Sequence, residues 1–291
     1  MKKLTILLLI IYILSLTSGC SPSQEPAQVV ATTLPVYDFT SLLCAGTNIT
    51  VKQLITENLS CLHDYTLQVD QMKAIEGAQV VILSGAGLEE FLEDALTGAN
   101  EVVDTSEGIS LLCGDHHDHE GHDHHHESDP HIWLDINNAR KMAQNICEGL
   151  VKQFPAHEQA IRENMRSLND EFNKLEAYGK AALSELSCRK LITFHDGFAY
   201  FAECYDLTIL KALEEESGSE ASAAELKDLI GLVRDNHLPA IFTEVNGSTA
   251  AASIVAAETG ISVCTLNMAM SGSGYFEAMY QNINTIKEAL G

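Results

Sequence analysis

Short runs of β-branched residues alternate with stretches of helical spacing along most of this chain, and this alternation limits the folds open to it. In the first half the expected strands cover Val29–Leu34, Ile49–Ile55, Gln79–Gly85 and Glu101–Thr105, with helical patterns between or after them. Such alternation is typical of parallel sheets flanked by helices. The sequence therefore predicts an α/β fold with a mainly parallel sheet in each half. The expected strands of the second half are Lys190–His195, Leu207–Leu213, Ala240–Val245 and Ser262–Asn267. The helical patterns include 88–96 in the first half and 223–236 and 275–290 in the second.

One helical pattern between the two halves is much longer than the others. Apolar residues recur every three or four positions from Ile161 to Leu186, and the span 157–187 contains no proline. At 1.5 Å per residue such a helix is roughly 45 Å long, more than one small domain needs. It either lies on one domain or links two lobes. We predict an N-terminal lobe (29–156), a linking helix (157–187) and a C-terminal lobe (188–291).

The composition excludes two classes of function. The chain has 291 residues, of which 46% are hydrophobic, enough to form one large core or two of ordinary size. Its 41 acidic and 17 basic residues give a formal net charge of −24. Because this charge repels phosphate backbones, we expect no binding of nucleic acid. Only one long apolar run is present, which excludes a protein that crosses a membrane several times.

That apolar run lies at the N-terminus and has the layout of an export signal. Lys2 and Lys3 precede Leu4–Leu16, which is shorter than the roughly 20 residues of a membrane span. The small residues before Cys20 resemble the lipobox of bacterial lipoproteins, in which the cysteine is acylated, although Thr17 replaces the usual leucine. We predict a signal peptide (1–19), a lipidated Cys20 with a polar tether (20–28), and an extracytoplasmic protein anchored to the bacterial cell membrane. A plain signal peptide is the alternative.

The other cysteines show no motif of metal binding or redox chemistry. None of them forms a C-x-x-C pair, so a zinc ribbon or a thioredoxin-type site is unsupported. Export permits disulfides, and Cys188 with Cys204, or Cys44 with Cys61, could form one. Free buried thiols fit the sequence equally well. The cysteines in question are Cys44, Cys61, Cys113, Cys147, Cys188, Cys204 and Cys264.

A histidine-rich segment, 114–128, lies within the predicted N-terminal lobe. Its histidines are interleaved with carboxylates. Because the segment has almost no apolar side chains, it cannot pack into a core. Neutral imidazole suits Zn²⁺, Cu²⁺ and Ni²⁺. We interpret the segment as an auxiliary collector of metal ions rather than one rigid site. Its histidines are His116, His117, His119, His122, His124, His125 and His126.

Three further histidines occupy better ordered contexts. His63 comes just after an expected strand, His131 lies between the histidine-rich segment and a helix, and His195 ends an expected strand. In an α/β fold, ligands bind at the carboxyl ends of parallel strands, so the two lobes could bring these side chains together. Three imidazoles around one ion leave a fourth position for another protein group or for water.

The segments around these histidines resemble a family of bacterial lipoproteins that supply zinc or manganese to ABC importers. The specific matches are DPHIWLD (129–135) and TFHDGFAYF (193–201). Weaker matches surround His63, cover IFTEVNGS (241–248) and lie near the C-terminus, in the family's order. The resemblance implies two α/β lobes bridged by one long helix, with the ion between them. It also implies His63, His131 and His195 as metal ligands and an ABC permease as partner.

The chain departs from the family pattern at the expected fourth ligand. The family's C-terminal strand usually ends Leu-Asp-Pro, with the aspartate as ligand, whereas this chain has Leu266, Asn267 and Met268. Asn267 and Glu244 are therefore candidate fourth ligands. Three neutral imidazoles suit Zn²⁺ better than Mn²⁺, which favours carboxylate oxygens.

Residues beside the expected ligands are candidates for supporting roles. Asp64, Asp135 and Asp196 each lie next to or near an expected ligand and could orient a ring nitrogen. Trp133, the only tryptophan, is expected to pack in the core at the boundary between the lobes.

We therefore predict a monomeric receptor that captures Zn²⁺ and delivers it to an ABC permease, with no catalysis. A manganese or iron receptor of the same family is the first alternative. A histidine-rich protein that stores or chaperones metal is the second, and a zinc-dependent hydrolase is the third. No H-E-x-x-H, G-x-S-x-G or P-loop motif supports an enzyme.

Overall fold

The structure of the protein is a computed structural model that describes residues 27–57, 62, 65–112, 128–213, 221–272 and 274–291. Several sequence predictions concern residues outside these ranges. They are the signal peptide, the lipidation of Cys20, the ligand His63 with its neighbour Asp64, and the seven histidines of the 114–128 segment.

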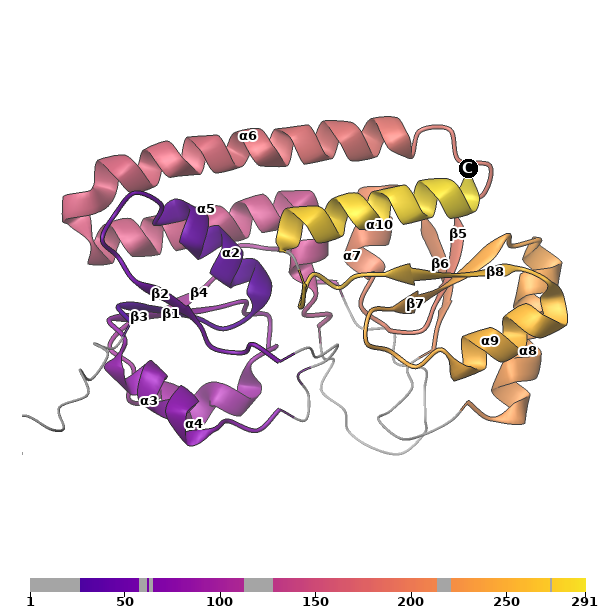
Figure 1. Cartoon of the computed structure of the whole chain (residues 1–291), viewed down its shortest axis with the longest axis horizontal. Helices are drawn as coiled ribbons and strands as arrows, with labels where there is room; N and C mark the ends of the chain where they lie inside the picture. Colours follow the sequence, from indigo (N-terminus) through magenta and orange to yellow (C-terminus); the bar gives the residue numbers. More distant parts are fainter. Residues whose placement is uncertain (1–26, 58–61, 63–64, 113–127, 214–220, 273) are drawn as a thin grey trace, which may run out of the picture.

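The N-terminal half contains one sheet of four parallel strands in the order β2-β1-β3-β4 (Figure 1). Strand β1 is fully buried, as its continuous apolar sequence requires when helices cover both faces of a parallel sheet. The elements of this half are β1 (Val29–Ala31), α2 (Leu34–Leu43), β2 (Val51–Gln53), α3 (Val69–Gly77), β3 (Val80–Leu83), η1 (Glu90–Leu92), α4 (Glu93–Leu96), β4 (Val102–Asp104), η2 (Ile132–Leu134) and α5 (Ile136–Gln153).

The C-terminal half repeats this topology, with four parallel strands in the order β6-β5-β7-β8. Strand β7 is buried along its whole length because it lies between β5 and β8. The predicted α/β fold with two mainly parallel sheets is confirmed. The elements of this half are β5 (Lys190–Thr193), α7 (Ala199–Cys204), β6 (Thr208–Ala212), α8 (Ala223–Asn236), β7 (Ala240–Glu244), α9 (Ala250–Thr259), β8 (Ser262–Leu266) and α10 (Tyr275–Leu290).

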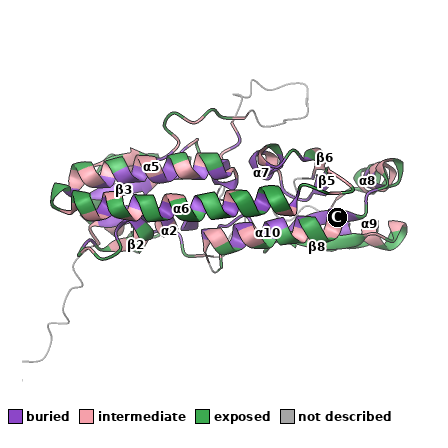
Figure 2. Ribbon diagram, turned by 90° about the horizontal axis from the view of Figure 1, so that it is seen from above, coloured by how far each residue is buried: buried purple, intermediate pink, exposed green. Residues whose placement is uncertain are grey.

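One long helix lies across both halves (Figure 1). After the short turn η3 (Pro155–His157), helix α6 (Glu158–Ala182) packs against α2 and α5 of the N-terminal half and against α10 of the C-terminal half. Its apolar residues, spaced by three or four, face these helices, and its outer side is exposed (Figure 2). The sequence left open whether this helix lies on one domain or joins two, and its contacts show that it joins the two halves.

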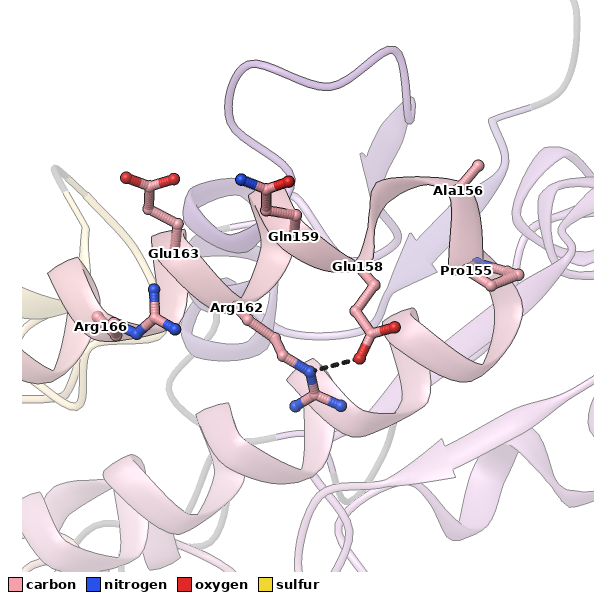
Figure 3. Close-up of a pocket in the computed structure, with 7 residues that line it drawn as sticks. All are labelled: Pro155, Ala156, Glu158, Gln159, Arg162, Glu163 and Arg166. Carbon is pink, nitrogen blue, oxygen red and sulfur yellow. Dashed lines mark hydrogen bonds and ion pairs between the residues drawn. The ribbon is translucent and has the colours of Figure 1, made fainter.

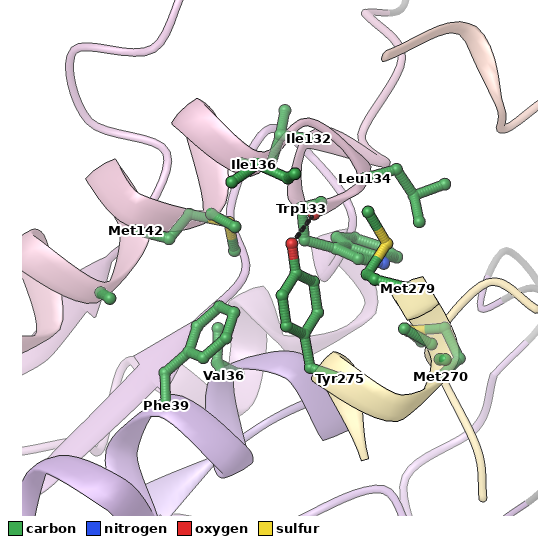
Figure 4. Close-up of a cluster of buried hydrophobic side chains, with 14 of the residues drawn as sticks. Val36, Phe39, Ile132, Trp133, Leu134, Ile136, Met142, Met270, Tyr275 and Met279 are labelled. Carbon is green, nitrogen blue, oxygen red and sulfur yellow. Dashed lines mark hydrogen bonds between the residues drawn. The ribbon is translucent and has the colours of Figure 1, made fainter. Parts of the chain in front are cut away.

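The main apolar core runs through the N-terminal half and continues across the boundary between the halves. At that boundary Phe39 packs edge-on against Phe172 and Tyr275. The hydroxyl of Tyr275 donates a hydrogen bond of 2.9 Å to the carbonyl of Trp133 (Figure 4). The Trp133 indole N–H donates one of 2.7 Å to the carbonyl of Met268. Trp133 is fully buried, as the sequence predicted. The two halves are thus joined by packing and by buried hydrogen bonds.

One local feature differs from the expectations, and the structure decides between two alternatives that the sequence left open. The predicted helix at 88–96 is instead the 3₁₀ turn η1 followed by the short helix α4, because the preceding Glu89 side chain binds the loop before it. The described cysteines are all free thiols, so the candidate disulfide between Cys188 and Cys204 is not formed. The Cys188 thiol donates instead to the carbonyl of Lys190, at a distance of 3.8 Å, and burial raises the pKa of Cys204 to about 11.

In the part of the chain that the structure describes, every helix is too short or too polar to span a membrane.

Candidate metal centre

Two of the three predicted ligands meet at the boundary between the halves. His131 directly precedes η2 on the N-terminal side, and His195 follows β5 of the C-terminal sheet. Both are buried, and their Nε2 atoms lie 3.4 Å apart. The ring planes are nearly perpendicular, at 87°, with their centroids separated by 5.2 Å. The structure therefore brings together two side chains that are 64 positions apart in the sequence.

The separation of these nitrogens matches the geometry of a tetrahedral zinc site. With zinc–nitrogen bonds of about 2.0–2.1 Å and tetrahedral angles, two ligating nitrogens lie roughly 3.3–3.4 Å apart. The Nε2 atoms of His131 and His195 are already at this distance. Little movement of either ring is therefore needed for both to ligate one ion.

Asp129 fixes the orientation of the His131 ring. Its Oδ1 atom lies 2.8 Å from Nδ1 of His131 and accepts a second hydrogen bond, of 2.9 Å, from the backbone N–H of the same residue. The hydroxyl of Tyr200 donates to the backbone carbonyl of Asp129, which ties this segment to the C-terminal half. In the tautomer that donates from Nδ1 to this carboxylate, the ring presents the lone pair of Nε2 to its partner, the arrangement found in carboxylate–histidine–metal sites.

Glu244 has a similar place beside His195. It ends the buried strand β7, and its Oε1 atom lies 3.8 Å from Nδ1 of His195. Both side chains are no more than 9% exposed. Gly247 leaves room for this carboxylate, because a Cβ atom at that position would lie 2.6 Å from Cγ of Glu244. Each ring of the pair therefore has a buried carboxylate on its Nδ1 side.

Gly197 supplies the space in which the two rings meet. A Cβ atom at this position would lie 2.8 Å from Cδ2 of His195 and 3.1 Å from Cε1 of His131. It would also lie 2.5 Å from Cε of Met268. A side chain at this position would therefore displace at least one of the groups that border the nitrogen pair.

Two residues singled out in the sequence are engaged elsewhere. Asp135 was a candidate to orient a ring, but it caps α5, accepting hydrogen bonds from the backbone N–H groups of Asn137 and Asn138. Asn267 was a candidate fourth ligand, and its Oδ1 atom accepts a hydrogen bond of 2.8 Å from the backbone N–H of Ala269. The asparagine oxygen is thus part of the turn that follows β8.

The sequence analysis missed the roles of Asp129, Gly197 and Met268 in this site. Asp129 lies only two positions before His131, and this short spacing is a signal that could have identified it. Gly197 and Met268 carry no such signal, because their nearness to the rings depends on how loops of different strands meet.

The described residues contain only part of a coordination sphere. Among them no group of three or more His, Cys, Asp or Glu side chains is arranged to hold a metal ion. His63, the third predicted ligand, lies outside the described ranges.

A surface hollow at the start of α6 is a separate feature (Figure 3). Its Arg162 pairs with Glu158 and with Glu148 of α5, at 2.8 Å and 3.0 Å. Its lining contains neither histidine nor cysteine, so it is no candidate for the metal centre. The residues that line it are Pro155, Ala156, Glu158, Gln159, Arg162, Glu163 and Arg166.

Comparison with known proteins gives one family over almost the whole chain. The profile described as "Zinc-uptake complex component A periplasmic" (ZnuA) matches residues 29–289. The high-affinity zinc uptake system protein ZnuA of Bacillus subtilis (strain 168) is 26% identical over 294 residues, covering 95% of this chain and 92% of that protein. The zinc-binding lipoprotein AdcA of Streptococcus pneumoniae (strain R6) is 26% identical over 307 residues, which are 99% of this chain but only 61% of AdcA.

Solved structures agree with these matches. A crystal structure of ZnuA has a TM-score of 0.80 and 28% identity, covering 91% of this chain and all of that one. A ZnuA deletion mutant crystallised with zinc bound has a TM-score of 0.78 and 27% identity, covering 91% of this chain and 98% of that one. The described fold is therefore that of these ZnuA structures.

Proposed function

Because this chain belongs to the family of periplasmic zinc-uptake components A, we propose that it is a receptor that captures Zn²⁺ and delivers it to an ABC permease. The observation that carries the proposal is the pair of Nε2 atoms, 3.4 Å apart, that the two halves of the chain present to each other. The names of the relatives from B. subtilis and S. pneumoniae, a zinc uptake protein and a zinc-binding lipoprotein, support the choice of zinc. This chain spans about three fifths of the S. pneumoniae relative, so the proposal concerns that portion alone.

Zinc is the cargo of this site and undergoes no chemical change there. His131 and His195 bind it through Nε2, and His63 serves as the third ligand. Asp129 acts behind the His131 ring: by accepting the Nδ1 proton it keeps the Nε2 lone pair directed at the ion. Glu244, 3.8 Å from Nδ1 of His195, places a negative charge behind the second ring. This assignment makes Glu244 a positioning residue rather than the fourth ligand.

The charges around the rings favour a cation. Oδ2 of the buried Asp129 has no hydrogen-bond partner among the described residues. A buried carboxylate oxygen without a partner is costly, and a nearby cation offsets that cost. A divalent ion between His131 and His195 would supply the positive charge.

Zinc is favoured over manganese by the kind of donor that faces the ion. The groups that meet at Gly197 are imidazole edges and a methyl group, whereas the two carboxylates lie on the far side of the rings. Neutral imidazole nitrogen suits Zn²⁺, and Mn²⁺ prefers carboxylate and other oxygen ligands. The alternative receptor for manganese or iron is therefore less compatible with this site.

Trp133 makes the proposal directly testable. It is the only tryptophan in the chain, and its ring centroid lies 5.4 Å from that of His131, so its fluorescence reports on an ion at this site. We expect Zn²⁺ to change the emission of metal-free protein with one-to-one stoichiometry, and a large excess of Mn²⁺ not to displace it. Displacement by equimolar Mn²⁺ would favour the manganese receptor. An unchanged emission despite zinc binding would favour storage by the histidine-rich segment.

The same measurement distinguishes imidazole ligands from others. Protons compete with metal for imidazole nitrogen, since only the neutral ring ligates. We expect the zinc affinity to fall by at least about ten-fold between pH 7.5 and pH 5.5. Equal affinities at the two pH values would contradict ligation by histidine.

We also propose that the receptor is held at the outer face of the cell membrane through Cys20. The apolar run 4–16 and the small residues before Cys20 support export and acylation, and the S. pneumoniae relative is named a lipoprotein. Cys20→Ala should move the protein from the membrane fraction to the soluble extracytoplasmic fraction. Retention in the membrane fraction would contradict a lipid anchor at this residue.

A further inference from the structure

Met268 borders the same space as the two histidine rings. Its terminal carbon, Cε, and the ring carbons Cδ2 of His195 and Cε1 of His131 all lie within 3.1 Å of the place that a Cβ atom of Gly197 would occupy. Each of these ring carbons is bonded to the Nε2 atom of its ring. The methyl end of a thioether therefore lies near the edges of both rings.

Four hydrogen bonds fix the backbone of Met268 and its neighbours in this position. The carbonyl of Met268 accepts from the indole N–H of Trp133. The N–H and C=O groups of Asn267 bind the side chain of Asn282, at 2.7 Å each, and Oδ1 of Asn267 accepts from the N–H of Ala269. Ala269 adopts a left-handed conformation with φ of 58°. The turn after β8 therefore holds the Asn267 oxygen in a hydrogen bond to its own backbone and directs the next side chain, Met268, towards the rings.

The donors on this side of the rings are neutral and comparatively soft. The edges of two imidazole rings and the methyl end of one thioether lie around Gly197, and the carboxylates of Asp129 and Glu244 lie on the Nδ1 sides of the rings. A thioether is a soft ligand that favours Cu(I), and imidazole also binds copper. The flexible methionine side chain can adjust its sulfur to an ion of different size.

From this arrangement we propose that the site also binds monovalent copper, with the Met268 sulfur as an additional ligand beside His131 and His195. The inference rests on the proposed function only in placing the metal at this pair of rings. Zinc occupies the site through nitrogen donors, whereas Cu(I) gains the sulfur. Met268 thereby determines which ions the receptor accepts.

The test uses full-length, metal-free protein in anaerobic buffer, with Trp133 emission as the local signal. Cu(I) is supplied from a bathocuproine disulfonate buffer that fixes its free concentration, so copper bound by other histidines or thiols does not distort the titration. Zn²⁺ is titrated separately. The variant is Met268→Leu, which removes the sulfur but keeps a similar apolar volume. The matched control is Met270→Leu, a buried methionine two positions along the same loop.

We expect Met268→Leu to weaken Cu(I) binding at least about ten-fold more than it weakens Zn²⁺ binding, and Met270→Leu to change both affinities less than about two-fold. X-ray absorption of the Cu(I) protein should show a sulfur contribution that Met268→Leu lowers. Equal losses for both ions, or unchanged Cu(I) affinity, would overturn the inference while leaving the zinc receptor intact. If Zn²⁺ itself failed to alter Trp133 emission in the unmodified protein, the proposed function would fail independently of the copper result.

Discussion

The two sheets have the same strand order, yet each uses a buried glutamate near its third strand in a different way. In the N-terminal half Glu89 follows β3, and its carboxylate accepts hydrogen bonds from the Thr32 hydroxyl and from the backbone N–H groups of Ser84 and Gly85, at 2.6–3.0 Å. In the C-terminal half Glu244 ends β7 and faces the Nδ1 atom of His195. In the same topology, Glu89 thus stabilises a loop and Glu244 lies next to a candidate metal ligand.

The difference lies in what each carboxylate meets at the strand ends. Gly85, Ala86 and Gly87 all have positive φ, and this tight turn wraps its N–H groups around Glu89. At the C-terminal sheet the strand β5 ends beside β7 and carries His195, so Glu244 meets an imidazole instead. Burial raises the pKa of Glu89 to about 7 despite its three hydrogen bonds. A buried acid in this fold therefore marks a binding site only where a ligating side chain faces it.

Removal of a ligand should have the largest effect on zinc binding. We expect His131→Ala to weaken the tight site by about 100-fold or more, because one of its nitrogen ligands is lost. His124→Ala, in the histidine-rich segment, should change this affinity less than about two-fold. Competitive titration against a zinc chelator measures both. Similar losses from the two variants would place the tight site in the segment rather than between the lobes.

A side chain at Gly197 should have the next largest effect. In Gly197→Ala the added Cβ atom would lie well within contact distance of His195 and Met268, so the rings must move apart from their 3.4 Å nitrogen separation. We expect zinc affinity to fall by roughly 10- to 100-fold. Gly231→Ala is the control, because a Cβ atom at that position meets nothing within 4 Å. A Gly197→Ala protein with unchanged affinity would show that this geometry is not the one that binds zinc.

Exchange of the two glutamates for glutamine tests the comparison itself. Glu244→Gln should lower zinc affinity by about ten-fold, because a carboxylate behind a ligating histidine strengthens the binding of the metal to that ring. Asp129→Asn should lower zinc affinity at least as much. Glu89→Gln should leave zinc affinity within about two-fold and instead destabilise the fold by about 1–3 kcal/mol, because its amide cannot satisfy the same backbone donors. Zinc titration and urea unfolding of each variant provide the two measurements. A larger loss of zinc binding in Glu89→Gln than in Glu244→Gln would reverse the comparison.

The last prediction concerns how the stability of the metal-free fold depends on pH. The pKa of Glu89 is raised from 4.5 to about 7, so the folded state binds a proton more tightly than the unfolded state between these values. The contribution of Glu89 to stability is therefore fully present below about pH 4.5 and declines by roughly 3 kcal/mol as the pH rises to about 7. In metal-free protein, Glu89→Gln should remove this decline. Parallel pH profiles of the free energy of unfolding in the two proteins would contradict the raised pKa.

The sequence by itself determined the succession of elements and the histidines worth examining. Helices such as 223–236 and 275–290 have the predicted bounds because their apolar spacing and flanking residues are local signals. The region 88–96 was mispredicted because the Glu89 side chain contacts a distant strand end, which local spacing does not encode. Within the site, His131 was identified from the short DPHIWLD segment, whereas the role of Asp129, two positions before it, was missed.

Tertiary structure alone decided which groups surround the rings. His131, Gly197 and Met268 come from segments far apart in the sequence, and the packing of the two halves under α6 brings them together. The same packing placed Glu244 beside His195. It also directed the Asn267 oxygen to a hydrogen bond with the backbone of its own loop. Residue types and spacing name the donors, but only the convergence of chain segments in space determines which donors share an ion.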